Sequence, residues 1–119
     1  MNAGSHVLLF QVQIVLHCAA TVQFDENLSK ALNMNVVAVA SLIKTCKKMK
    51  GLHSFVHVST AYCHCQNDHI EETSYPPPLT PSKATALLES LDSNLMDCTE
   101  VTKKIIGDRP NTYSYTKVI

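Results

Sequence analysis

The feature that most constrains this chain is a change of apolar period between two short β-branched runs. The first run, residues 12–17 (VQIVLH), has the composition of a buried strand. Over residues 26–49 apolar side chains recur at steps of three and four, which predicts a long helix with Asp25 as a candidate N-cap and Gly51 as a candidate stop. The run at residues 54–59 (SFVHVS) predicts a second strand. This order predicts a βαβ unit with parallel strands and a right-handed crossover.

A proline-bearing stretch follows the second strand. Residues 64–83 include three consecutive prolines, Pro76–Pro78, which cannot lie in a helix interior or a central strand. We therefore expect 64–83 to form an extended surface excursion. Leucines at helical spacing come next, with Ser82 as a candidate cap, and residues 107–110 (GDRP) are expected to end that helical segment. A last, short helix is predicted to begin near Asn111.

The charge balance and the apolar pattern argue against two kinds of partner. The chain has 10 Lys+Arg and 10 Asp+Glu, and Arg109 is its one arginine, whereas a nucleic-acid surface needs a basic patch. The apolar stretch near the N-terminus is interrupted by Gln11, Gln13 and His17. It falls short of the ~20 apolar residues that a membrane span requires. We expect no nucleic-acid binding and no membrane span in this chain.

The cysteines indicate a reducing environment. There are five of them, an odd number, and no basic segment followed by a clean apolar block precedes them as a secretory leader would. An intracellular location with reduced thiols is the simpler interpretation. Cys18 and Cys46 fall inside apolar patterns, so both are predicted to be core residues.

The stretch from residue 53 to 69 (HSFVHVSTAYCHCQNDH) holds four of the six histidines together with Cys63 and Cys65. Structural zinc usually binds ligand pairs two to four residues apart, with a second pair farther along the chain. Cys-x-Cys is tighter than that spacing, and only His69 follows it. We predict no metal site here, but a strand that tolerates histidines and then a polar loop.

Two patterns place reactive side chains where ligands bind in open α/β folds. Thr60 ends the second strand and would deliver a hydroxyl to the carboxyl edge of the sheet. Tyr113 and Lys117 lie four residues apart, on one face of the last helix. A neighbouring ammonium favours ionisation of a phenol, which makes the phenol a usable proton donor. Tyr115 has no such partner. Each pattern alone is also common on ordinary surfaces.

Together these patterns resemble the short-chain dehydrogenase/reductase superfamily, extended type. Four stretches narrow the resemblance to the alcohol-forming fatty acyl-CoA reductases of animals, especially insects. The stretches are HCAATVQFDENLSKALNMNVVAV, FVHVSTAYCHC, HIEETSYPPP and IGDRPNTYSYTK, in this order. The resemblance covers roughly residues 12 to 118. The long separation of Thr60 from Tyr113, filled by the proline-bearing segment, is similar to that of the reductases.

The resemblance implies a fold, a reaction and a location. The fold would be α/β, part of a Rossmann-like doubly wound parallel sheet, with residues 1–119 as a partial NAD(P)-binding domain. NADPH would supply hydride to a long-chain fatty acyl-CoA and then to the resulting aldehyde, giving a primary fatty alcohol and free coenzyme A. The family is associated with peroxisomal or endoplasmic reticulum membranes.

The resemblance also implies roles for individual residues. Thr60 matches a hydroxyl that polarises the substrate carbonyl, and Tyr113 matches the proton donor. Lys117 matches the lysine that tunes the tyrosine and holds the nicotinamide ribose. Asn35 matches an asparagine of a proton relay, although it could also be a polar residue on the exposed side of its helix. Residues 17–20, His17 with Cys18, Ala19 and Ala20, match the strand-end turn that runs beside the cofactor.

One departure from the family is large. The chain has three glycines, Gly4, Gly51 and Gly107, and no glycine-rich strand–turn–helix to hold a pyrophosphate. We therefore expect the first, glycine-rich βαβ half to be missing, and the chain to be an internal fragment that is inactive alone. Two alternatives stay open. One is another extended dehydrogenase acting on a sterol or a nucleotide sugar, and the other is a catalytically dead fragment or a binding module that uses the Cys/His cluster.

Overall fold

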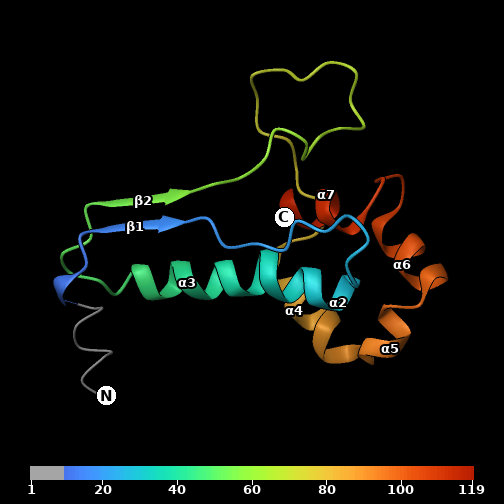
Figure 1. Ribbon diagram of the computed structural model, residues 1–119, viewed down its shortest axis with the longest axis horizontal. Helices are drawn as coiled ribbons and strands as arrows, with labels where there is room; N and C mark the ends of the chain where they lie inside the picture. Colours follow the sequence, from blue (N-terminus) through green and yellow to red (C-terminus); the bar gives the residue numbers. More distant parts are fainter. Residues whose placement is uncertain (1–9) are drawn as a thin grey trace.

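The computed structural model describes residues 10–119, and it contains a small parallel sheet above one long helix (Figure 1). Strand β1 (Ile14–His17) pairs in parallel with β2 (Ser54–His57), with Ile14 opposite Ser54 and His17 opposite His57. The helix that connects the two strands runs back beneath them. The predicted βαβ unit and the α/β class are therefore confirmed, although both strands are shorter than their apolar runs.

The long helix is continuous but contains a wider turn. It consists of α2 (Leu28–Leu32), the π-helical turn η1 (Asn33–Val37) and α3 (Ala38–Cys46). The prediction over residues 26–49 is right in type and too long at both ends. Its N-cap is Asn27 rather than Asp25, and it ends at Cys46, before Gly51.

The first turn of α2 is completed by a residue from far along the chain. The N-cap Asn27 makes no capping bond with its own side chain. Instead, the Asp97 carboxylate accepts hydrogen bonds from the Ser29 backbone N–H at 2.9 Å and from the Ser29 hydroxyl at 2.7 Å. A carboxylate is favoured at this end of a helix because the first N–H groups are free and carry partial positive charge. Burial of Leu28 and Leu32 then fixes the helix against its neighbours.

The strands are more exposed than their composition predicted. Ile14 is 61% exposed, Leu16 is 70% exposed and Val56 is 45% exposed. A parallel sheet is buried only when layers cover both faces, and in the described residues the long helix covers one (Figure 1). The prediction that Cys18 is a core residue is wrong for the same reason: it follows β1 and is exposed, whereas Cys46 is buried as expected.

Residues 58–80 contain no helix or strand, and they lead into α4 (Pro81–Ser90). The start of α4 lies inside the range 64–83 that was expected to be extended. Its cap is Thr80, whose hydroxyl accepts from the Lys83 N–H at 3.4 Å, rather than Ser82. Pro81 suits the first helical position because its missing N–H would have no partner there.

The C-terminal helical segment divides into three helices, where one was predicted. After α4 come α5 (Ser93–Met96) and α6 (Thr99–Ile106). The break before α5 arises because the Asp92 side chain accepts from two backbone N–H groups and starts a new helix. Gly107 ends α6 with φ 61° and ψ −131°, a conformation that suits glycine alone. The last helix, α7 (Thr112–Lys117), starts at the Asn111 cap, where the sequence predicted a start.

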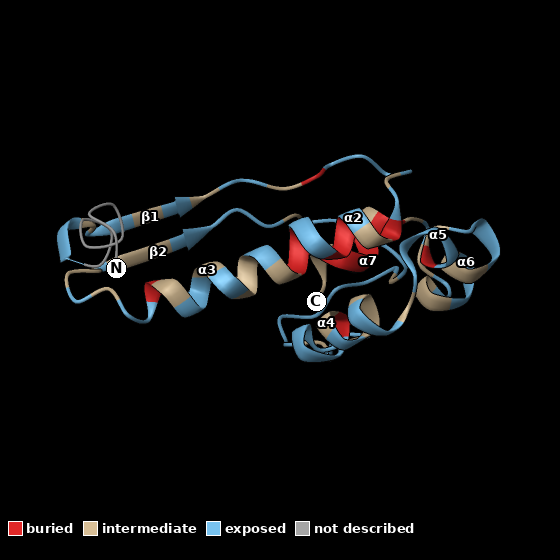
Figure 2. Cartoon of the chain, turned by 90° about the horizontal axis from the view of Figure 1, so that it is seen from below, coloured by how far each residue is buried: buried red, intermediate tan, exposed pale blue. Residues whose placement is uncertain are grey.

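The core lies at one end of the molecule, where helices rather than strands meet. Figure 2 shows buried segments gathered around α2 and α7, away from the sheet. The buried cluster comprises Leu28, Leu32, Val36, Ala84, Met96 and Tyr115. No helix formed by residues 10–119 has both the length and the apolar character needed to cross a bilayer.

Candidate active site

The Tyr-x-x-x-Lys helix lies beyond the carboxyl ends of both strands (Figure 1). The Lys117 Nζ donates a hydrogen bond to the backbone oxygen of Val58 at 3.3 Å. Val58 follows β2 directly and stands two residues before Thr60. The structure therefore brings the lysine of the motif to the sheet edge that carries the predicted hydroxyl residue. Ligands bind at this edge in open parallel sheets.

The two tyrosines of α7 have different surroundings. Tyr113 is partly exposed, and its ring lies 5.4 Å from that of Phe24, tilted by 48°. Tyr115 is 4% exposed and belongs to the core cluster. Burial raises the pKa of the Tyr115 phenol, and the positive charge of Arg109 opposes that rise. Of the two phenols, Tyr113 is the more exposed one.

Thr60 sits in a turn just after the strand. Its side chain is partly buried, and its hydroxyl oxygen accepts from the Tyr62 backbone N–H at 3.2 Å. Within the described residues, Thr60 makes no direct hydrogen bond to Tyr113 or Lys117. The hydroxyl proton stays available to a third group, such as a carbonyl oxygen, that lies between the two elements.

Asn35 joins the loop after β1 to α7. It lies in the π turn and is 8% exposed, so it is not on the exposed side of its helix. Its Oδ1 accepts from the Thr21 N–H at 3.0 Å, and its Nδ2 donates to the Thr21 oxygen at 3.2 Å and to the Thr116 hydroxyl at 3.0 Å. The side chain therefore fixes the loop against the helix that carries Tyr113. π turns are frequent at functional sites.

The turn predicted to pass beside the cofactor, residues 17–20, starts at the last residue of β1. Cys18 and Ala19 are exposed, and Ala20 is partly buried. Thr21 is held by Asn35 and also donates through its hydroxyl to the Glu26 carboxylate at 3.0 Å. The alanines present little bulk at the carboxyl edge, so a dinucleotide backbone could approach the chain closely there.

Two histidines at the strand ends form a pair that sequence reasoning did not single out. The Nδ1 atoms of His17 and His57 are 2.8 Å apart, and the rings stack with centroids 5.0 Å apart. Burial lowers the pKa of His57, and the charges of Lys117 and His17 lower it further. One of the two nitrogens donates and the other accepts, and which one donates depends on the tautomers of the rings. The feature that could have revealed this pair is the parallel register of the two strands, which sets His17 opposite His57.

The Cys/His stretch is divided between separate contacts. The ring of His64 packs on Tyr75 with centroids 4.6 Å apart, and His69 lies 3.5 Å from the Glu71 carboxylate. Across residues 10–119, no three His, Cys, Asp or Glu side chains gather closely enough to hold a metal ion.

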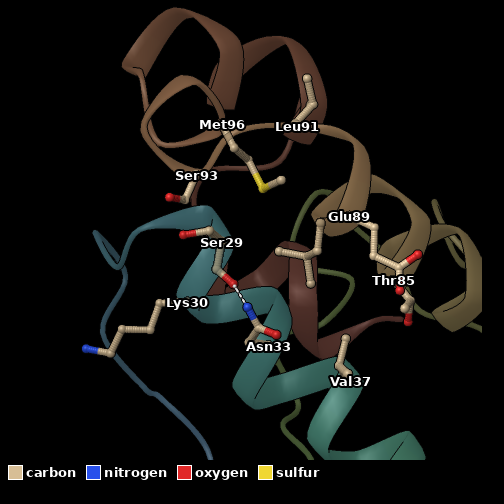
Figure 3. A pocket seen from close by; sticks show the side chains of 10 residues that line it. Ser29, Lys30, Asn33, Val37, Thr85, Glu89, Leu91, Ser93 and Met96 are labelled. Atoms are coloured by element: carbon tan, nitrogen blue, oxygen red, sulfur yellow. Dashed lines mark hydrogen bonds between the residues drawn. The ribbon is translucent and has the colours of Figure 1, made fainter.

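A cavity of about 700 Å³ lies elsewhere, between the long helix and the segment from α4 to α5 (Figure 3). It is lined by polar side chains such as Ser29 and Asn33 and by the apolar Val37, Leu88 and Met96. An internal hydrogen bond from Asn33 Nδ2 to the Ser29 oxygen, 3.0 Å long, borders it. None of the predicted site residues lines this cavity.

The parallel βαβ unit, with a Tyr-x-x-x-Lys helix at its carboxyl edge, defines an α/β domain of the NAD-binding, Rossmann-like class. The comparison with protein families agrees, since an NAD-binding family model described as "Male sterility protein" matches residues 3–119. The chain belongs to this family.

Named relatives are similar over almost the whole chain. Human fatty acyl-CoA reductase 1 is 49% identical over 113 residues, which is 95% of this chain and 22% of the relative. The Xenopus laevis protein of the same name is 50% identical over 108 residues, covering 91% and 21%. Mouse fatty acyl-CoA reductase 2 is 45% identical over 112 residues, covering 94% and 21%. The chain therefore spans about a fifth of the length of these relatives.

Proposed function

We propose that this chain forms part of an NADPH-dependent fatty acyl-CoA reductase. Such an enzyme uses one hydride from NADPH to reduce a long-chain fatty acyl-CoA to an aldehyde with release of coenzyme A, and a further hydride to reduce the aldehyde to a primary alcohol. The observation that carries the proposal is the contact of Lys117 with Val58 at the carboxyl edge, because it sets the Tyr113 helix beside the Thr60 turn. The names of the relatives support the substrate class. The family model supports a nicotinamide cofactor.

In this proposal each site residue acts at a stated atom. NADPH, when bound, supplies the hydride. The Thr60 hydroxyl donates a hydrogen bond to the carbonyl oxygen of the substrate, where negative charge builds during reduction. The Tyr113 phenol gives its proton to that oxygen. After the first reduction the carbon–sulfur bond breaks, coenzyme A leaves as the thiol and the aldehyde remains. Lys117 stands one helical turn from Tyr113 and would hold the ribose, while the Ala19–Ala20 segment gives the cofactor room at the edge.

Asn35 has a supporting part in the proposal. Its three hydrogen bonds hold the loop after β1 and the helix of Tyr113 in one arrangement. We also propose an intracellular location at peroxisomal or endoplasmic reticulum membranes. The free state of all five cysteines is in keeping with a reducing compartment.

The test uses a chimera in which this chain replaces the matching segment of human fatty acyl-CoA reductase 1. The assay is NADPH-dependent conversion of a long-chain acyl-CoA to alcohol. Tyr113→Phe keeps the ring and removes the proton, so turnover should fall by ~10²–10⁴-fold, the usual contribution of general acid catalysis. Thr60→Ala should also lower turnover. Tyr115→Phe is the matched control and should cost little, with thermal melting as the check on folding.

Two outcomes would contradict the proposal. One is a silent Tyr113→Phe together with a damaging Tyr115→Phe, which would show that the motif is assigned wrongly. The other is a folded chimera that produces no alcohol with any long-chain acyl-CoA.

A further inference from the structure

Arg109 lies at the junction of the two last helices, between Gly107, which ends α6, and Asn111, which caps α7. Its side chain is partly buried and extends to a distant part of the chain. The guanidinium Nη1 donates hydrogen bonds to the Cys63 backbone oxygen and, at 3.4 Å, to the Gln66 Oε1. One side chain thus meets two acceptors of the turn that follows Thr60.

That turn is held internally by short-range bonds. The Tyr62 N–H donates to the Thr60 hydroxyl at 3.2 Å. The Asn67 N–H donates to the His64 oxygen at 3.0 Å, which closes a turn of four residues. Among the described residues, the hydrogen bonds that connect residues 60–67 to the helices come from Arg109. Arg109 therefore holds the turn itself, while Lys117 holds the chain at Val58, two residues before Thr60.

The backbone around Arg109 is also held by hydrogen bonds. The Arg109 N–H donates to the Ile106 oxygen at 3.4 Å, and two residues later the Asn111 side chain accepts from the Ser114 N–H at 2.8 Å. The backbone of Arg109 is therefore held between the end of α6 and the start of α7, the helix that carries Tyr113. The Arg109 charge acts to lower the pKa of the buried Tyr115 phenol, which is in keeping with a guanidinium that lies close to α7.

We propose that Arg109 is a positioning residue that holds the turn carrying Thr60 against the start of α7, and so fixes the Thr60 hydroxyl relative to the Tyr113 phenol. The proposal rests on the proposed function for the roles of Thr60 and Tyr113. Arginine suits this task because its planar guanidinium carries five N–H donors in a rigid fork and can serve two acceptors at once. A lysine at this position would present one compact ammonium on a flexible stem.

The first test measures the contact itself, by hydrogen–deuterium exchange of single backbone amides in the chain. Arg109→Met keeps an unbranched side chain and removes every donor, so exchange at Tyr62 and Asn67 should become at least about tenfold faster, since hydrogen bonds to charged groups are the stronger ones. Arg109→Lys should give a smaller increase. The Tyr115 amide, bonded to the Asn111 oxygen at 3.2 Å, reports whether α7 stays folded. Lys104→Met, an exposed position on α6, is the control for loss of a positive charge.

Unchanged exchange at Tyr62 and Asn67, with α7 intact, would overturn the proposal. If Arg109→Met also speeds exchange at Tyr115, the comparison moves to Arg109→Lys, which keeps the charge. Equal exchange at Tyr62 and Asn67 in wild type and Arg109→Lys would then count against a role for the guanidinium fork.

The second test asks whether Arg109 acts through Thr60, and it uses the chimera described above. Arg109→Met should lower kcat with little change in KM for the acyl-CoA. In a Thr60→Ala background the same substitution should have almost no further effect, because the hydroxyl that it positions is gone. Losses that multiply independently would overturn the positioning role. A silent Tyr113→Phe would instead defeat the proposed function, and the exchange measurement would still decide whether Arg109 holds the turn.

Discussion

Asn35 gives the sharpest test of how the candidate site is held together. Asn35→Ala removes three hydrogen bonds, two to the Thr21 backbone and one to the Thr116 hydroxyl. A typical intramolecular hydrogen bond contributes about 0.5–1.5 kcal/mol net, and a buried group left without a partner costs more. Thr21 is 7% exposed and Thr116 is 1% exposed, so water does not readily replace the lost amide. We expect the free energy of unfolding to fall by roughly 2–4 kcal/mol.

A double-mutant cycle separates the bond to α7 from the bonds to the loop. Thr116→Val keeps the shape of the side chain and removes the hydroxyl that Asn35 contacts. If the 3.0 Å bond between Asn35 and Thr116 contributes to stability, the two substitutions should be coupled by about 1 kcal/mol. The assay is urea unfolding followed by circular dichroism, with linear extrapolation to water.

Asn33→Ala is the matched control, since Asn33 lies in the same π turn but is exposed and bonds only within its own helix. Its cost should stay within about 0.5 kcal/mol, as for most surface substitutions. The reasoning would be refuted if the stability lost by the double variant equalled the sum of the losses of Asn35→Ala and Thr116→Val within ~0.3–0.5 kcal/mol. Such a result would show that no net interaction joins the π turn to α7.

Two further predictions concern the histidine pair and the end of α6. The folded chain depresses the pKa of His57 below its ordinary value of 6.5, so the unfolded chain takes up this proton at a higher pH than the folded chain does. The stability that this contributes is complete above pH 6.5 and is lost as the pH falls through the folded pKa of His57. In thermal melts across this range, the melting temperature should therefore fall less steeply with falling pH for His57→Gln than for the unchanged chain. The same dependence of melting temperature on pH in both would count against the effect. Gly107→Ala should destabilise the chain by about 1–3 kcal/mol from backbone strain alone, since φ is 61° and a Cβ would meet nothing within 4 Å. Gly51→Ala, where a Cβ would make an ordinary 3.5 Å contact, should cost clearly less by chemical unfolding, and equal costs would argue against strain at Gly107.

Local sequence patterns predicted the types of the main elements well. The two β-branched runs and the apolar stripe between them are each patterns of neighbouring residues. Their order along the chain was enough to predict the parallel βαβ unit. The π turn could not be predicted in this way. It coincides with Asn35, whose partners Thr21 and Thr116 lie 14 and 81 positions away, so no local window contains its hydrogen bonds.

Burial was harder to predict than secondary structure. Leu16 and Cys18 have apolar neighbours in the sequence and are nonetheless exposed, because burial depends on which layers cover a strand rather than on the strand itself. Tyr115 shows the opposite case. The spacing motif gave it no function, and the packing of α7 made it part of the core.

The candidate site was predictable as a set of residue types, but its geometry was not. The spacing of Tyr113 and Lys117 follows from helical periodicity, whereas the bond from Lys117 to Val58 requires the tertiary arrangement of α7 and β2. The pairing of His17 with His57 needs the strand register. The reach of Arg109 to Cys63 needs the path of the loop after β2.

The bond between Ser29 and Asp97 has a consequence for the order in which the chain folds during synthesis. The partners lie 68 positions apart, so when residues 28–46 leave the ribosome the first turn of α2 has no carboxylate to complete it. Most of the stability of a helix in a protein comes from packing of its apolar face against other elements. The helix that connects the two strands is therefore expected to become stable late, after α5 has emerged and brought Asp97 back to its start, and ribosome-bound chains stopped before residue 97 should be more open to proteases at residues 28–46 than chains stopped after it.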